Sequence, residues 1–315
     1  MIGDALDVAA PAEAVMSFIA DTRNAALLMD QADGVRVVPV PGTPVGEVGE
    51  RQVVIVPWPA GYVTTVREVV ARGPERIVTR TSAPSGLLSS FAVEPLGPET
   101  CRLFHVRSVA VTAQLADQLR ATVPQGVRWA LASIAHHVAG APAVGPPPGA
   151  STAEDRSRRA AELRALHTRA GVQRTATEAS IEIDAPPPVV WALVSDARHE
   201  PAAPDRADTV CFTVPGTPAG AVGELRCRVH GTAERATAEL SELVALDIGR
   251  MLATRQVAPG IHDRVTTVML EPVGTRSRVT CRVELVDHDP APAARERRRA
   301  ELEAYLGGIR LLAES

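Results

Sequence analysis

Hydrophobic and polar residues alternate along two long stretches of the chain, residues 35–110 and 209–286. Alternation with a period of two is typical of strands that bury one face, and the Gly and Pro residues between the runs are typical of turns. Each stretch therefore predicts six antiparallel strands. They are predicted at about 35–40, 48–57, 62–71, 76–82, 88–95 and 101–111, and again at about 209–214, 222–230, 235–245, 250–257, 265–272 and 277–286.

Apolar residues recur at helical spacing on either side of both stretches. Before each stretch, a short strand is followed by a proline, which suits the first turn of a helix, and then by a short helix. After each stretch comes a long helix with one apolar stripe. The short strands are predicted at 6–8 and 181–183, the short helices at 14–20 and 189–194, and the long helices at 125–139 and 293–313.

The two halves also share sequence. Residues 40–50 read VPGTPVGEVGE and residues 214–224 read VPGTPAGAVGE, so nine of eleven positions are identical at an offset of 174. This period is far longer than the roughly 20–50 residues of a solenoid repeat. It predicts a tandem duplication of one domain, with domains at 1–140 and 176–315. The linker between them, 141–175, is rich in Pro and Gly at first and is predicted to become helical.

Composition narrows the possible functions. The formal net charge of −4 and the lack of a clustered basic face argue against nucleic-acid binding. All 33 basic residues are arginine, which excludes Schiff-base catalysis by lysine and a P-loop lysine. The four cysteines are scattered without a C-x-x-C pair, as expected for reduced thiols in a cytoplasmic protein. With no signal-like segment and no run of 18 apolar residues, we expect no stable membrane insertion.

Several short motifs lie at the ends of the predicted helices and strands. They are an Ala-Pro before the first helix, an Asp-x-Arg after it, Gly46-x-x-Gly-Glu before a long strand and Glu94-Pro-Leu-Gly before the last strand. In these motifs the sequence resembles the START/Bet v 1-like helix-grip (SRPBCC) superfamily and its polyketide cyclase/dehydrase branch. The two copies together are similar to the tandem two-domain aromatase/cyclases of bacterial aromatic polyketide pathways. The Trp-Pro and Phe-Pro aromatics that usually follow the first helix of those enzymes have no counterpart here.

The resemblance implies an α+β fold of two tandem helix-grip domains, each a curved antiparallel sheet wrapped around a long C-terminal helix. It implies a cofactor-independent cyclase, dehydratase or aromatase that folds a hydrophobic polyketide intermediate in an apolar cavity. The partner is then a hydrophobic small molecule or a polyketide tethered to a carrier protein. Two alternatives stay open: a non-catalytic protein that binds or transports a lipid or isoprenoid, and a regulatory protein whose two copies scaffold a partner. No metal or nucleophile motif is present, and the oligomeric state is left open.

Side-chain parity along the strands predicts which residues face such a cavity. In the strand at 48–57, Arg51 belongs to the set whose counterparts in the second copy are all apolar, so we expect Arg51 to point inward. The same comparison predicts that Tyr62 points inward and that His105 points outward. Of the two adjacent histidines in the long helix, His137 is expected to lie closer to the apolar stripe.

Cyclisation or dehydration requires an enolate charge to be stabilised and a proton to be moved. Arg51 and Tyr62 are predicted to stabilise the charge and His137 to shuttle the proton, which makes these three the catalytic candidates. The first domain is therefore expected to hold the more polar cavity. The substrate-binding candidates are Trp58, Val66, Arg80, Phe104, Trp129, Ile134 and Tyr305.

Overall fold

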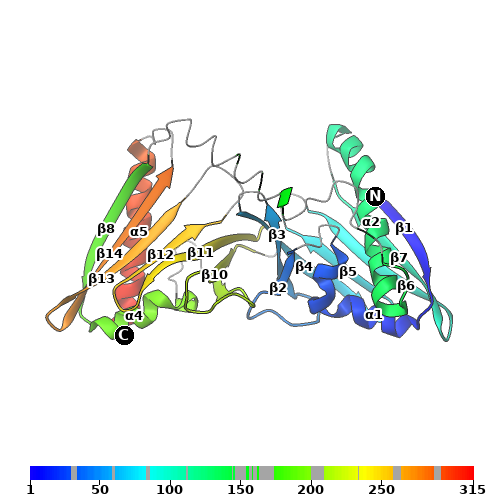
Figure 1. Ribbon diagram of the computed structural model, residues 1–315, viewed down its shortest axis with the longest axis horizontal. Helices are drawn as coiled ribbons and strands as arrows, with labels where there is room; N and C mark the ends of the chain where they lie inside the picture. The colour runs from blue at the N-terminus through cyan, green and yellow to red at the C-terminus, as the bar shows by residue number, and fades with distance from the viewer. Residues whose placement is uncertain are drawn as a thin grey trace. The chain divides into compact units, whose positions relative to one another are not determined.

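The chain forms two seven-stranded antiparallel sheets, each packed against a long helix (Figure 1). The structure is a computed structural model, and it describes residues 1–29, 34–58, 61–82, 86–110, 113–143, 145, 154–155, 158, 162, 174–199, 209–232, 234–257, 264–286 and 292–315. The chain divides into two compact units, and we call the unit built around each sheet domain 1 and domain 2. The predicted fold class, two tandem helix-grip domains of the α+β type, is confirmed.

Domain 1 follows the predicted order of elements. A first strand and two short helical segments precede six consecutive strands and a long helix. The elements are β1 (Ile2–Val8), α1 (Ala12–Ala20), η1 (Thr22–Leu28), β2 (Arg36–Pro39), β3 (Arg51–Trp58), β4 (Gly61–Gly73), β5 (Arg76–Thr81), β6 (Leu88–Gly97), β7 (Thr100–Ser108) and α2 (Ala113–Ala139).

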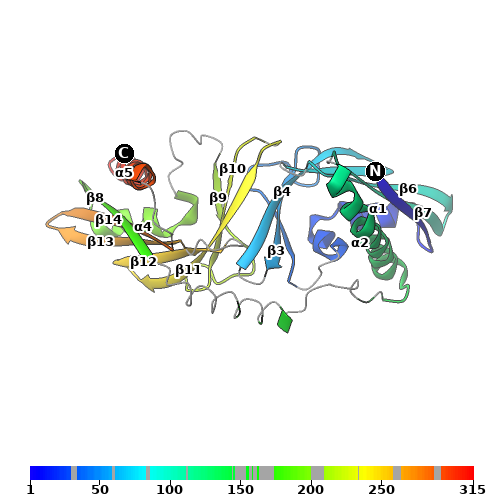
Figure 2. The same ribbon diagram turned by 90° about the horizontal axis from the view of Figure 1, so that it is seen from above.

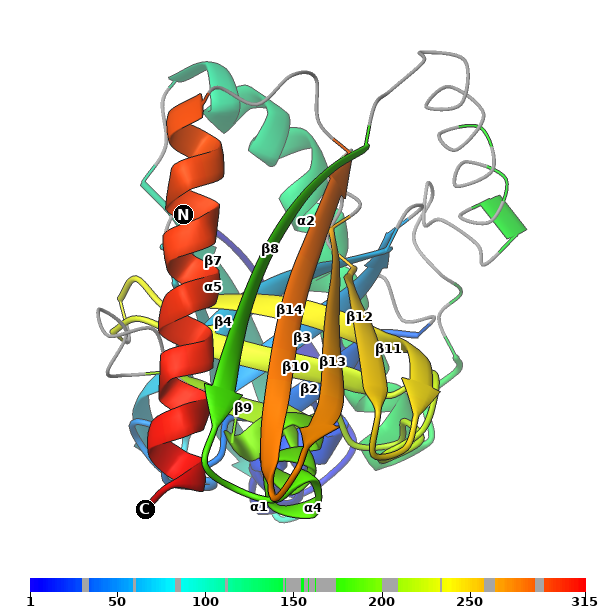
Figure 3. The same ribbon diagram turned by 90° about the vertical axis from the view of Figure 1, so that its left-hand side faces the viewer.

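Domain 2 repeats this order. Its elements are β8 (Arg174–Ile183), α4 (Pro187–Ser195), η2 (Ala197–His199), β9 (Val210–Thr213), β10 (Leu225–His230), β11 (Thr237–Asp247), β12 (Met251–Gln256), β13 (Val265–Val273), β14 (Arg276–Val286) and α5 (Pro292–Ala313). Figure 3 shows α5 running beside β8, and Figure 2 shows α5 nearly end-on, on one side of the strands β8, β14 and β13.

The two sheets have the same topology. Their strand orders are β1-β7-β6-β5-β4-β3-β2 and β8-β14-β13-β12-β11-β10-β9, so in each domain the first strand pairs with the last. The apolar stripe predicted for each long helix is buried against one face of the sheet. The buried stripe residues are Val127, Leu131 and Ile134 in α2, and Leu302, Leu306 and Ile309 in α5. Val138 and Tyr305, also predicted on the stripes, are partly buried, whereas Leu312, predicted on the stripe of α5, is exposed.

The predicted strands agree with the observed ones to within a few residues, because the period of two and the turn residues were both present in the sequence. The helix predicted at 125–139 is wrong at its beginning. It starts at Ala113, twelve residues earlier, and continues through Pro124. The predicted linker at 141–175 lies largely outside the described residues, so its helix stays a prediction.

The repeated VPGTP segment of domain 1 is a loop that closes on a buried carboxylate. Glu50 is only 1% exposed. Its side chain accepts hydrogen bonds from the backbone N–H of Gly46 (2.7 Å), from the hydroxyl of Thr22 (2.6 Å) and from the amide of Gln52 (2.8 Å). Gly46 has a φ of 73°, a left-handed conformation that glycine adopts without steric cost.

The same loop occurs in domain 2. Glu224 is 3% exposed and accepts hydrogen bonds from the backbone N–H of Gly220 (2.6 Å) and from the hydroxyl of Thr213 (2.9 Å). Gly220 also has a positive φ, of 66°. The identity of the two segments therefore reflects a loop that both copies need for folding.

We expect Glu50→Gln to lower the free energy of unfolding by about 1–3 kcal/mol. The amide N–H₂ cannot accept a hydrogen bond, so at least one of the groups that donate to the carboxylate is left buried without an acceptor. Urea unfolding of the full chain measures the effect. Glu47→Gln is the matched control: it lies in the same loop with an exposed side chain, so its effect should stay within about 0.5 kcal/mol. Equal effects of the two substitutions would contradict the role given to the buried carboxylate.

Candidate functional site

Each domain contains a cavity lined by residues of its sheet and of its short helical segments, and in domain 2 also by residues of α5. Cavity 1, in domain 1, has a volume of about 330 Å³, and cavity 2, in domain 2, has a volume of about 320 Å³. Both fall in the range of roughly 300–1,000 Å³ that small-molecule sites occupy. Apolar residues such as Val54, Ile77 and Phe91 in cavity 1 and Leu240, Leu252 in cavity 2 form part of the walls.

Three hydrogen-bonded polar side chains, Glu50, Gln52 and Arg67, line cavity 1. Gln52 on β3, which donates to Glu50, accepts a hydrogen bond from Nε of Arg67 on β4 (2.6 Å). Burial lowers the pKa of Arg67 to about 10, against the opposing effect of the nearby Glu50 carboxylate. Arg67 therefore remains a cation at neutral pH. Its two Nη groups make no hydrogen bond to the described residues, and they are available for a ligand.

His105 on β7 faces the same cavity. It is 1% exposed, its ring stacks on Phe91 with centroids 4.1 Å apart, and its Nε2 lies 3.0 Å from the hydroxyl of Ser89. Burial, helped by the positive charge of Arg107, lowers the pKa of His105 to about 3. The imidazole is therefore neutral at pH 7, with one ring nitrogen protonated and the other able to accept a proton.

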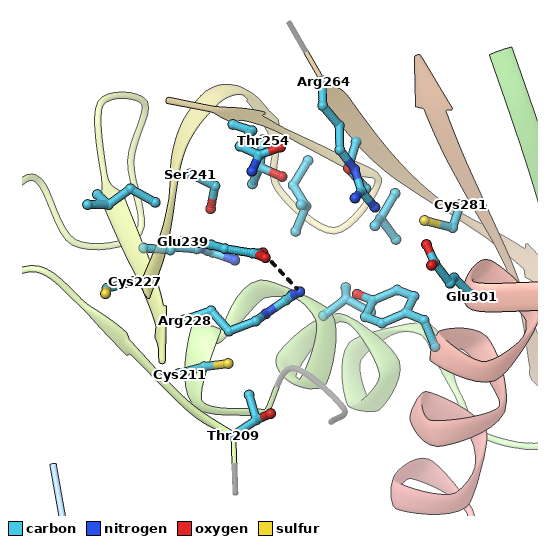
Figure 4. A pocket seen from close by; sticks show the side chains of 18 of the residues that line it. Thr209, Cys211, Cys227, Arg228, Glu239, Ser241, Thr254, Arg264, Cys281 and Glu301 are labelled. Carbon is cyan, nitrogen blue, oxygen red and sulfur yellow. Dashed lines mark ion pairs between the residues drawn. The ribbon is translucent and has the colours of Figure 1, made fainter. Parts of the chain in front are cut away.

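Cavity 2 carries more charged groups. Arg226 is buried and held by two partners, since its Nε donates to Glu224 (3.1 Å) and its Nη2 donates to the carbonyl oxygen of Ser195 (2.6 Å). Arg228 forms a loose ion pair with Glu239 at 4.0 Å, drawn as a dashed line in Figure 4. The expectation that domain 1 holds the more polar cavity is therefore wrong.

Two further groups of cavity 2 have weakened acidity. Burial raises the pKa of Tyr305, which lies on α5, well above its usual range. Burial also raises the pKa of the Cys281 thiol to about 12. Both groups are therefore protonated and neutral at physiological pH, and each is a hydrogen-bond donor toward the cavity.

The three residues predicted to be catalytic do not line either cavity. Cavity 1 is lined by Glu50, just before β3, and by Gln52 and Val54 of β3, so the alternation of the strand places Arg51 on the opposite face of the sheet. The lining residues of β4 are Thr65, Arg67 and Val69, so the alternation of this strand places Tyr62 on the opposite face. His137 is exposed on α2, where its Nδ1 lies 2.8 Å from the carbonyl oxygen of Ser133.

Of the predicted substrate-binding residues, Tyr305 does line a cavity. Two others, Trp129 and Ile134, are buried on α2 but are not among the described residues that line cavity 1. Val66 is buried and Arg80 is paired with Glu68 at 2.9 Å; both lie on the sheet face opposite the cavity, as does Phe104. The seventh, Trp58, is exposed at the end of β3.

The prediction that His105 points outward is wrong, and the error originates in one hairpin. Glu94 pairs with Arg102 across the β6–β7 hairpin, and Glu271 pairs with Arg278 across the β13–β14 hairpin. The first hairpin therefore has one residue more than the second. An ungapped comparison of the two copies slips by one residue beyond this point, and a slip of one residue reverses the face assigned to every side chain.

The strand pairing instead matches His105 with Cys281, and both line their cavities. The comparison of sequences had matched Phe104 with Cys281. The difference in hairpin length is visible in the sequence, because the offset between matching residues of the two copies changes at this hairpin. A comparison that allowed for this change would have placed His105 inside.

We expect the free energy of unfolding to decrease as the pH is lowered below 6.5. In this range His105 stays neutral in the folded chain but is protonated in the unfolded chain. The folded pKa of about 3 lies below the ordinary value of 6.5, so the unfolded state binds the extra proton. The free energy of unfolding is then highest above pH 6.5 and falls by up to about 1.4 kcal/mol per pH unit below it.

Urea unfolding between pH 7.5 and pH 5.5 measures this slope, a range chosen to stay above the titration of most carboxylates. His105→Gln should flatten it, whereas His137→Gln, at an exposed position of α2, should leave it unchanged. An unchanged slope in His105→Gln would show that the buried imidazole is not the source.

Among the described residues, no helix combines the length and the apolar character needed to cross a membrane. No curated protein matches the sequence. Among solved structures, the di-domain ARO/CYC StfQ from the steffimycin biosynthetic pathway is 15% identical, over 99% of this chain and 97% of StfQ, with a TM-score of 0.35. The di-domain ARO/CYC BexL from the BE-7585A biosynthetic pathway is 14% identical, over 100% and 98% of the two chains, with a TM-score of 0.37.

A START superfamily protein from Mycobacterium smegmatis is 11% identical, over 44% of this chain and 97% of its own, with a TM-score of 0.37. At these TM-scores we draw no functional argument from the three likenesses. The sequence of domain 2 gives the firmer assignment, because residues 174–313 match the model of the family described as polyketide cyclase / dehydrase and lipid transport. This match lies in domain 2 and covers less than half of the chain.

Proposed function

We propose that the protein is a cofactor-independent polyketide cyclase or aromatase whose reaction takes place in cavity 1. The observation that carries this proposal is that a cationic group, Arg67, and a neutral imidazole, His105, line one cavity with apolar walls. These are the two chemical functions that cyclisation of a poly-β-ketone needs. The family of domain 2 supports the same class of ligand.

The reaction begins with the removal of a proton from a methylene carbon that lies between two carbonyl groups. The electron pair left behind forms an enolate, and its negative charge gathers on oxygen. Arg67 stabilises that charge through its Nη groups, which are not occupied by the described residues, and His105 takes the proton. Preorganised donors in a site of low dielectric are worth far more than the same donors in water.

The enolate carbon then forms a bond to a more distant carbonyl carbon of the same molecule. The oxygen of that carbonyl becomes an alkoxide and takes the proton from His105. Loss of this hydroxyl and of a neighbouring proton as water then gives the double bond of the new ring. No electrons are gained or lost overall, so the sequence needs no redox partner.

The environment of His105 suits this exchange of one proton. Burial holds the pKa of His105 at about 3, so the ring is a weak base. A developing enolate beside it favours the protonated form and raises its basicity during the reaction. The neighbouring Ser89 hydroxyl, 3.0 Å from Nε2, fixes the orientation of the ring.

We expect Arg67→Gln and His105→Gln each to lower the turnover of an aromatic-polyketide precursor by about thirty- to thousandfold, because each removes an interaction that strengthens in the transition state. Single-turnover assays read by mass spectrometry measure the cyclised product. Arg51→Gln is the matched control, since it changes the same kind of side chain on the other face of the sheet, and its turnover should match the wild type.

The alternative within the same family is lipid transport without catalysis. In that case no precursor is converted, and the substitutions at Arg67 and His105 change only the dissociation constant of a bound lipid. Absence of product with the wild-type protein, together with retained lipid binding, would overturn the cyclase proposal.

A further inference from the structure

Gln52 lies between a buried anion and a buried cation in domain 1. Its amide nitrogen donates to the Glu50 carboxylate (2.8 Å) and to the Thr22 hydroxyl (3.0 Å), and its amide oxygen accepts from Nε of Arg67 (2.6 Å). Gln52 is only 4% exposed, so bulk water does not replace these partners. The reversed amide would place two acceptors together at Glu50 and two donors together at Arg67, so the network fixes its orientation.

The cation of this network belongs to domain 1 and not to the shared fold. The backbone N–H of Val69 and that of Leu243 each donate to the carbonyl oxygen of the buried glutamate in their own domain, both at 2.9 Å. Two residues before them lie Arg67 in domain 1 and Ser241 in domain 2, so these two positions are equivalent. Domain 2 therefore has a neutral residue at the position of Arg67.

Domain 2 has its cation at the position of Gln52 instead. There Arg226 donates from Nε directly to Glu224 (3.1 Å) and from Nη2 to the carbonyl oxygen of Ser195 (2.6 Å). The cation of domain 2 thus neutralises the buried glutamate and supports the framework. The cation of domain 1 is separated from its glutamate by a neutral amide group.

This separation determines how much positive charge a ligand in cavity 1 encounters. The interaction between two ions weakens with distance, and it is strongest where water is excluded. A carboxylate in contact with Nε of Arg67 would offset much of the guanidinium charge, whereas an amide oxygen carries no net charge. Burial lowers the pKa of Arg67 to about 10 and Glu50 opposes this effect, so Arg67 is a cation at neutral pH with an uncharged partner.

We propose that Gln52 is a positioning residue that keeps the charge of Arg67 available to an anionic oxygen in cavity 1. It binds Nε, it holds the Glu50 carboxylate away from the guanidinium group, and it leaves both Nη groups for the ligand. The inference rests on the proposed cyclisation for the identity of that oxygen, which is the enolate oxygen. Its test does not require turnover, because any anion bound beside Arg67 interacts with the same charge.

Two variants move a carboxylate into contact with Arg67. Gln52→Glu adds one beside Glu50. The double variant Glu50→Gln with Gln52→Glu exchanges the amide and the carboxylate, so the net charge of the chain is unchanged and only the position of the carboxylate differs. Both variants keep an acceptor for Nε of Arg67.

The pKa of bound 4-nitrophenol measures the charge that reaches the cavity. Its phenolate carries negative charge on a conjugated oxygen, as an enolate does, and it absorbs visible light that the neutral phenol does not absorb. We expect the pKa of the bound probe to be at least one unit higher in Gln52→Glu and in the double variant than in the wild type, a tenfold change in acid dissociation. Arg67→Gln should raise it as well, which identifies cavity 1 as the binding site.

Two further variants are the matched controls. Glu50→Gln disturbs the loop as the double variant does but places no carboxylate at position 52, so it should not raise the pKa of the bound probe. Arg51→Gln makes the net charge more negative by one, as Gln52→Glu does, but on the other face of the sheet, and should leave this pKa unchanged. Arg107, the other arginine that lines cavity 1, is present in every variant.

Thermal unfolding and turnover complete the test. A purely structural role would change the melting temperatures of Glu50→Gln and the double variant without separating the pKa of the probe in the two proteins. Turnover of an aromatic-polyketide precursor should be tenfold or more lower in the double variant than in Glu50→Gln. Should Gln52→Glu unfold because two carboxylates lie side by side, the double variant, which has one, still decides.

Each outcome has a definite meaning. An equal pKa of the bound probe in Glu50→Gln and the double variant would overturn the role of Gln52, and so would a wild-type protein that does not bind the probe through Arg67. A raised pKa in the double variant, together with no product from the wild type, would retain the role of Gln52 and overturn the cyclase reaction instead.

Discussion

The structure of each domain depends on a glutamate whose carboxylate is buried beside its cavity. A buried carboxylate costs several kcal/mol unless donors surround it. Glu50 obtains donors from Gly46 in the loop, from Thr22 at the start of η1 and from Gln52 in β3, so one side chain connects three parts of domain 1. Glu224 does the same in domain 2 with Gly220, Thr213 and Arg226.

The position of this carboxylate also determines which side chains of the following strand line the cavity. Once Glu50 faces the cavity, the period of two in β3 brings Gln52 and Val54 to the same face. In domain 2 the same rule brings Arg226 and Arg228 to the cavity. The loop and the carboxylate are retained in both copies, while the positions two and four residues further along differ in size and charge. Two different cavities thus arise on one scaffold.

The order and bounds of the strands were predictable because their pattern and turns depend on local sequence. The direction of the side chains in β3 was not, because both faces of this strand are buried. Val53 and Ile55 are 0% exposed on one face, while Gln52 and Val54 are 4% and 5% exposed on the other. Hydrophobicity therefore does not distinguish the cavity face. We assumed that the apolar set faces the ligand, and this assumption placed Arg51 inside.

A more reliable signal was the glutamate that both copies preserve next to an apolar strand. A charged residue kept at the end of a buried strand requires partners, and those partners are polar groups of the cavity face. Tyr305 was placed correctly because the helical stripe has only one buried face. Cavity residues such as Arg67 and Arg264 were missed because their roles depend on neighbours that are distant in sequence.

Arginine is the sole basic residue type besides histidine in this chain, so each guanidinium acquires its role from the groups within reach. Arg226 donates to Glu224 and to a backbone carbonyl, which makes it part of the framework of domain 2. In domain 1 the same position is Gln52, which binds Nε of Arg67 and leaves the other end of that guanidinium toward the cavity. The fixed donor geometry of arginine makes this division possible, because one edge binds the protein while another addresses a ligand. Exchange of Gln for Arg beside an unchanged glutamate therefore alters the chemistry of the cavity without altering the loop on which the fold depends.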